Sequence, residues 1–206
     1  MQKKLETIGF ILSWFAIITQ FILIIQNRQS DIPETIIRFF TFFTILTNLW
    51  VALFFTCKIF PFTKHLTIFN KRGILTALTT FILIVGLVYQ FVLRGIWQPH
   101  GMQRIVDELL HTIVPLFVLF YWIIFSGKEK INFGDTAIWL LYPLVYFLSV
   151  LLRGHFSNYY PYPFLNISVI GVEKVLINSV IILLFMLVIM AILVGVKNKF
   201  TKKQFN

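Results

Sequence analysis

The chain has 206 residues, of which 58% are hydrophobic and only 13% are charged, with a formal net charge of +10. Soluble domains carry roughly 25% charged residues, so this composition excludes a soluble enzyme and any large domain outside a membrane. An excess of basic residues is typical of the loops on the cytoplasmic side of a membrane, and we expect no nucleic acid among the partners.

The charged residues divide the chain into long apolar stretches. Taken in chain order, the charge-free stretches cover 7–27, 39–57, 73–93, 109–127, 136–152 and 175–196. A helix needs about 20 predominantly apolar residues to cross a bilayer. The sequence therefore predicts an all-α integral membrane protein, a six-transmembrane-helix bundle that forms a single polytopic domain over residues 1–206. The predicted spans lie at about 8–26, 38–57, 73–93, 109–126, 136–152 and 169–196.

The first apolar segment follows two basic residues, Lys3 and Lys4, as the apolar core of a signal peptide does. Its uncharged run of 21 residues is too long for the apolar core of a signal peptide, which has about 7–15 residues. We therefore expect it to be retained as a span.

A seventh uncharged stretch, 154–172, is rich in aromatic residues but does not fit a span. Pro161 and Pro163 would interrupt the hydrogen bonds of a helix, and Asn158 and Asn166 add polar groups. We expect residues 154–168 to form a loop at the membrane interface, either as a partial lid that folds back over the bundle or as a plain interfacial anchor. The last helix then begins near Ser168 or Val169.

The lysine and arginine residues predict the orientation. With six spans, the side that holds both termini collects 12 of them and the other side collects 6. Because basic residues accumulate on the cytoplasmic side, the sequence predicts a multi-pass protein of the cell membrane with both termini in the cytoplasm, an N-in/C-in arrangement.

Polar side chains continue from the first loop into the second predicted span. Arg38, Thr41, Thr44 and Asn48 would fall on one stripe if the helix were straight, since successive residues turn by about 100°. Polar groups inside a span are costly and indicate a functional site. The alternative is that Thr44 and Asn48 simply hold neighbouring helices together, as such residues commonly do.

The fourth predicted span begins with two carboxylates and a histidine. Asp107 and Glu108 precede His111 by four and three residues, so either side chain can reach the imidazole on a helix. Pro115 follows and should kink the helix, which would open a pocket. The alternative is a capped helix with an interfacial histidine.

Three short elements resemble those of the androgen-induced protein family of integral membrane hydrolases, and they occur in the same order. They are Arg38-Phe39-Phe40-Thr41-Phe42, then Leu110-His111-Thr112 followed by Pro115, and Tyr160-Pro161-Tyr162-Pro163-Phe164-Leu165. The chain is more similar to the bacterial six-span relatives, in which Phe-Phe-Thr-x-Phe-Thr-x-x-Thr-Asn and Arg-Gly…Tyr-Pro-Tyr-Pro-Phe-Leu occur together.

The resemblance implies a threonine hydrolase of a lipid or fatty-acyl ester, with Thr41 as the nucleophile and His111 as the general base. The alternative is a non-catalytic protein that binds a lipid or a small amphiphile in the same pocket. The expected partners are membrane lipids, and we expect no cofactor and no metal. The expected supporting residues are Arg38, Thr44, Asn48, Arg94, Asp107, Glu108, Arg153, Tyr160 and Tyr162.

Overall fold

The computed structural model describes residues 1–60, 66–127 and 130–203, and in these ranges all regular structure is helical. Lys64 and Lys128, two of the basic residues used to predict orientation, lie outside the described residues. The α-helices are α1 (Gln2–Gln26), α2 (Ile32–Phe40), α3 (Phe43–Ile59), α4 (Ile74–Val88), α5 (Gly101–Glu108), α6 (Val114–Phe125), α7 (Phe133–Ala137), α8 (Leu141–Ser157) and α9 (Ile167–Lys203).

Short segments of other helix types complete the elements. Three are 3₁₀-helices: η2 (Thr67–Asn70), η5 (Ile138–Leu140) and η6 (Pro163–Leu165). Two are π-helices, η3 (Tyr89–Leu93) and η4 (Leu109–Ile113). The π-helix η3 continues α4, and η4 joins α5 to α6, so both lie within long helices.

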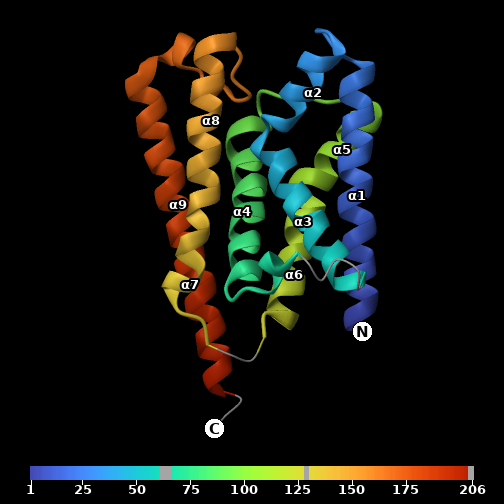
Figure 1. Cartoon of the computed structure of the whole chain (residues 1–206), viewed down its shortest axis with the longest axis vertical. Helices are drawn as coiled ribbons and strands as arrows, with labels where there is room; N and C mark the ends of the chain where they lie inside the picture. Colours follow the sequence, from blue (N-terminus) through green and yellow to red (C-terminus); the bar gives the residue numbers. More distant parts are fainter. Residues whose placement is uncertain (61–65, 128–129, 204–206) are drawn as a thin grey trace.

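Five helices in the described residues are long and apolar enough to cross a membrane. They are Gln2–Gln26, Ile74–Leu93, Gly101–Phe125, Phe133–Ser157 and Ile167–Thr201. A sixth results if the bent pair α2 and α3 is counted as one span. These helices indicate a multi-pass membrane protein, and Figure 1 shows that α1 begins and α9 ends at the same end of the bundle.

The second predicted span was expected to be one helix over 38–57, and this is wrong. The chain breaks between Phe40 and Phe43 and bends by 73°. Phe42 is extended, with φ −81° and ψ 124°, while the Thr41 hydroxyl donates to the Arg38 carbonyl at 2.6 Å. The Tyr146 hydroxyl on α8 donates to the Thr41 carbonyl at 2.9 Å. Backbone groups freed within a membrane need such partners, and side chains supply them here.

Helix α4 lies at the centre of the bundle, between α3, α6 and α9 (Figure 1). Of an apolar 18-residue stretch of Ile74–Leu93, the span that begins with α4, 67% is buried. The corresponding share in Phe133–Ser157 is only 11%. The span that contains α8 therefore lies at the periphery, where apolar side chains such as Leu144, Leu148 and Leu152 are exposed. Exposed leucines on such a surface suit contact with lipid chains.

Candidate active site

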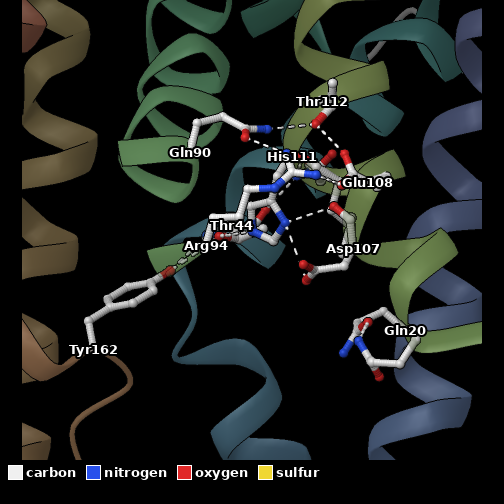
Figure 2. Close-up of polar contacts among 12 residues, drawn as sticks. Gln20, Thr44, Gln90, Arg94, Asp107, Glu108, His111, Thr112 and Tyr162 are labelled. Carbon is white, nitrogen blue, oxygen red and sulfur yellow. Dashed lines mark hydrogen bonds and ion pairs between the residues drawn. The ribbon is translucent and has the colours of Figure 1, made fainter. Parts of the chain in front are cut away.

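A threonine and a histidine meet at the beginning of α3, in the half of the bundle away from both termini (Figures 1 and 2). The Nε2 atom of His111 lies 3.3 Å from the Thr44 hydroxyl oxygen. Thr44 is in the first turn of α3 and is only 8% exposed, and the His111 side chain is 10% exposed. The pair is thus close enough for proton transfer with little adjustment.

Asp107 holds the other side of the imidazole. The Nδ1 atom of His111 lies 2.9 Å from the Asp107 backbone carbonyl oxygen and 3.4 Å from its carboxylate Oδ1. A carbonyl oxygen can only accept a hydrogen bond, so Nδ1 carries the proton, and Nε2 of the neutral ring presents its lone pair to Thr44. This is the tautomer that a general base needs.

The π-helix η4 and two neighbours position the imidazole. Pro115 has no N–H to donate to the His111 carbonyl, which lies four residues earlier, so the regular helical bond at this point is absent. Gly86 on α4 brings the two helices together here, since a Cβ at this position would lie 2.8 Å from the His111 carbonyl oxygen. Tyr89 stacks on the imidazole, with ring centroids 4.1 Å apart and planes 15° apart. Such π segments are frequent at functional sites.

Tyr162 reaches Thr44 from the loop between α8 and α9 (Figure 2). Its hydroxyl oxygen accepts from the Thr44 backbone N–H at 3.2 Å and lies 3.3 Å from the Thr44 hydroxyl. The ring is buried, stacks on Phe164 and meets Phe42 edge-on. Burial raises the pKa of the Tyr162 phenol, so its hydroxyl keeps its proton and can donate it in a hydrogen bond to an oxyanion.

Asn48 connects α3 to η4 one turn below Thr44. Its Nδ2 donates to the Thr44 carbonyl at 2.9 Å and to the Leu110 carbonyl at 3.3 Å. The side chain is fully buried, and within the described part of the chain its Oδ1 has no hydrogen-bond partner. Asn48 therefore fixes the backbone that carries Thr44 relative to the backbone that carries His111.

Glu108, the other candidate partner for His111, turns to a neighbouring network. Its carboxylate accepts from the Thr112 hydroxyl at 2.7 Å and pairs with Arg94. Gln90 donates to Thr112 at 2.8 Å and accepts from Arg94 at 2.5 Å. Asp107 is therefore the carboxylate at the imidazole, while Arg94 and Glu108 lie beside the site in Figure 2.

The remaining predicted site residues lie in other surroundings. The Thr41 hydroxyl is bonded to its own helix, as described above, and His111 contacts Thr44 instead. Arg38 and Arg153 both bind Glu34 at 2.7 Å and 2.6 Å. Tyr160 packs on Gly154, where a Cβ would lie 2.1 Å from its ring.

Sequence reasoning missed Tyr89 and Gly86, and it gave Thr44 only a supporting role. A glycine within an apolar helix is a recognisable sign of close helix packing. Nothing local identifies the neighbour of Gly86, because that contact joins segments 25 residues apart.

No group of three or more His, Cys, Asp and Glu side chains among the described residues could hold a metal ion.

No family model matches this chain, and neither a curated protein nor a solved structure matches it. The resemblance to the androgen-induced protein family therefore stays a prediction, and the function has to be argued from the geometry of the site.

Proposed function

We propose that this protein is an intramembrane threonine hydrolase of a lipid or fatty-acyl ester, with Thr44 as nucleophile and His111 as general base. The observation that supports it most is the chain of contacts from the Thr44 hydroxyl through the imidazole to Asp107. A threonine hydroxyl is a weak nucleophile until an oriented base removes its proton. The order nucleophile, base and carboxylate is that of hydrolase triads.

The reaction proceeds in two steps. In the first, the Thr44 hydroxyl gives its proton to Nε2 of His111 while its oxygen attacks the ester carbonyl carbon. The bond to the alcohol then breaks, His111 returns the proton to the departing oxygen, and an acyl–threonine ester remains. In the second step a water gives a proton to His111 and attacks the same carbon, so that the fatty acid leaves and Thr44 regains its proton.

Tyr162 completes the site as the donor to the oxyanion. Its hydroxyl lies beside the Thr44 oxygen that would attack the carbonyl, and a positioned donor there stabilises the negative charge that develops in the transition state. Asp107 is assigned the role of holding the imidazole in the required tautomer and stabilising the imidazolium that forms.

This proposal moves the nucleophile from Thr41, which the resemblance implied, to Thr44. Two threonines three residues apart provide a matched pair of variants. We expect a fluorophosphonate probe to label Thr44, as shown by peptide mapping, and to lose this labelling in Thr44→Ala and His111→Ala but not in Thr41→Ala. Boiled protein is the negative control.

Other outcomes of this experiment have clear meanings. Labelling that survives in Thr44→Ala and disappears in Thr41→Ala would restore Thr41 and overturn the assignment. Absence of labelling, together with saturable binding of a long-chain ester, would favour the non-catalytic lipid binder over the enzyme.

We further propose six spans, with the bent pair α2 and α3 as the second and both termini in the cytoplasm. The common end of α1 and α9 in Figure 1 supports an even number of crossings. The 12-to-6 distribution of lysine and arginine supports the orientation. A reporter fused to the C-terminus should behave as cytoplasmic, and a translocated reporter would contradict this topology.

A further inference from the structure

A groove of about 830 Å³ runs along α8 on the side that faces α2 and α3. Its volume lies in the range of about 300–1,000 Å³ that is usual for ligand sites. The residues that line it include Thr41, Leu46, Trp50, Ile138, Tyr142 and Val145, and neither Thr44 nor His111 is among them. The groove is thus separate from the candidate active site.

The groove is elongated and reaches apolar surface. Ile138 and Arg153 both line it, and the 15 helical steps from one to the other correspond to about 22 Å. The groove is therefore longer than one leaflet is thick, since each leaflet takes about 15 Å of a hydrocarbon core of about 30 Å. Leu141 and Val145 line the groove and are 62% and 53% exposed, so lipid chains beside α8 can enter it laterally.

Two arginines share one carboxylate at the Arg153 end of the groove. Arg153 Nη2 and Arg38 Nε bind the same oxygen, Oε1 of Glu34, at 2.6 Å and 2.7 Å. Both guanidinium groups also lie on the Tyr159 ring, 5.1 Å and 4.4 Å from its centroid. One carboxylate for two guanidinium groups leaves this cluster with one excess positive charge.

The cluster keeps hydrogen-bond donors for an anion. Arg38 uses Nε for Glu34, and among the described residues no hydrogen-bond partner is found for its two terminal nitrogens. Within the same described residues, Arg153 Nη1 makes only a long contact of 3.3 Å with the Ser157 hydroxyl. A guanidinium presents paired donors that match the oxygens of a phosphate.

We propose that the groove binds one acyl chain of an anionic phospholipid, with the lipid phosphate on Arg38 and Arg153. The excess charge of the cluster matches the single negative charge of a phosphodiester. A phospholipid also suits the lateral opening, since its second chain can stay in the bilayer. The site is independent of the hydrolase chemistry and does not rest on it.

The test uses the full chain in nanodiscs that contain equal amounts of phosphatidylglycerol and phosphatidylcholine, followed by native mass spectrometry of the lipids retained in detergent. We expect phosphatidylglycerol to be enriched on the wild type. Arg38→Ala and Arg153→Ala should each reduce this enrichment about tenfold, because each removes a charge-assisted contact. Arg28→Ala is the matched control and should leave the enrichment unchanged, because Arg28 is exposed, donates to the Ile25 carbonyl and is not among the residues that line the groove.

Two further variants separate lipid binding from a structural role of the ion pairs. Glu34→Gln should increase the enrichment, because the carboxylate that competes with the phosphate is lost. Ser149→Trp fills the groove from its exposed side and should displace the retained lipid whatever its headgroup. An unchanged lipid ratio in the Arg38 and Arg153 variants, an equal loss in Arg28→Ala, a decrease in Glu34→Gln, or enrichment of free fatty acid instead of phospholipid would each overturn the proposal.

Discussion

The replacement Tyr162→Phe removes one hydroxyl that has two roles at the start of α3. The first backbone N–H groups of any α-helix have no partner within the helix. Phe42, which precedes α3, provides no side-chain cap for them. The Tyr162 hydroxyl accepts from one of them, the N–H of Thr44, across 118 positions of sequence. It acts as a helix cap supplied by a distant loop, and it also lies beside the proposed nucleophile.

The magnitude follows from these contacts. A buried donor left without a partner costs about 1–3 kcal/mol, and loss of a helix N-cap costs about 0.5–2 kcal/mol. We therefore expect Tyr162→Phe to lower the free energy of unfolding by about 1–2 kcal/mol. Loss of an oxyanion donor should also slow ester hydrolysis about 10²- to 10³-fold.

Denaturant unfolding in detergent micelles and hydrolysis of a long-chain ester measure these two effects. Tyr160→Phe is the matched control, because the Tyr160 ring packs on Gly154 and no hydrogen bond of its hydroxyl is found in the described ranges. Equal stability of the two variants would refute the capping role. Full activity in Tyr162→Phe would remove this residue from the mechanism.

Three further predictions test the rest of the site. Asp107→Asn should slow hydrolysis about 10²-fold, less than the 10⁴-fold known for triads, because the backbone carbonyl still holds Nδ1 of His111. Activity should fall on acidification because a protonated imidazole cannot accept a proton, and residual activity in His111→Asn should lose this dependence in a pH–rate profile. Gly86→Ala should destabilise the protein by about 1–3 kcal/mol through overpacking against the His111 carbonyl. Gly195→Ala, where a Cβ meets nothing within 4 Å, should not.

The helices could be predicted from the sequence because lipid leaves the backbone few alternatives. An uncharged run of about 20 residues in a membrane has to satisfy its own hydrogen bonds, and gaps between charges therefore indicate helices directly. The last helix begins at Ile167, one or two residues before the predicted start at Ser168 or Val169. Pro161 and Pro163 had predicted that 154–168 forms a loop, because proline lacks a backbone donor. This is only partly right, since α8 continues to Ser157 and Pro163–Leu165 form a short 3₁₀-helix, which a proline can begin.

The break in the second span could not be predicted in this way. Residues 40–43 contain neither glycine nor proline, the usual signs of a helix break. The Thr41 carbonyl at the break accepts from the Tyr146 hydroxyl, 105 positions away. Tyr162, 118 positions away, likewise bonds the first turn of α3. Such partners exist only once the bundle has formed, so periodicity within the segment gives no sign of them.

The same break explains why Thr41 and Thr44 have different environments. In a straight helix the two hydroxyls would lie on one stripe, and the sequence offers no reason to prefer Thr44 as the nucleophile. Because α2 ends at Phe40, the Thr41 hydroxyl turns back to the Arg38 carbonyl, and Thr41 lines the groove along α8. Thr44 enters the first turn of the next helix and faces His111. A bend between two threonines thus separates a residue of the proposed lipid groove from the residue to which we assign the chemistry.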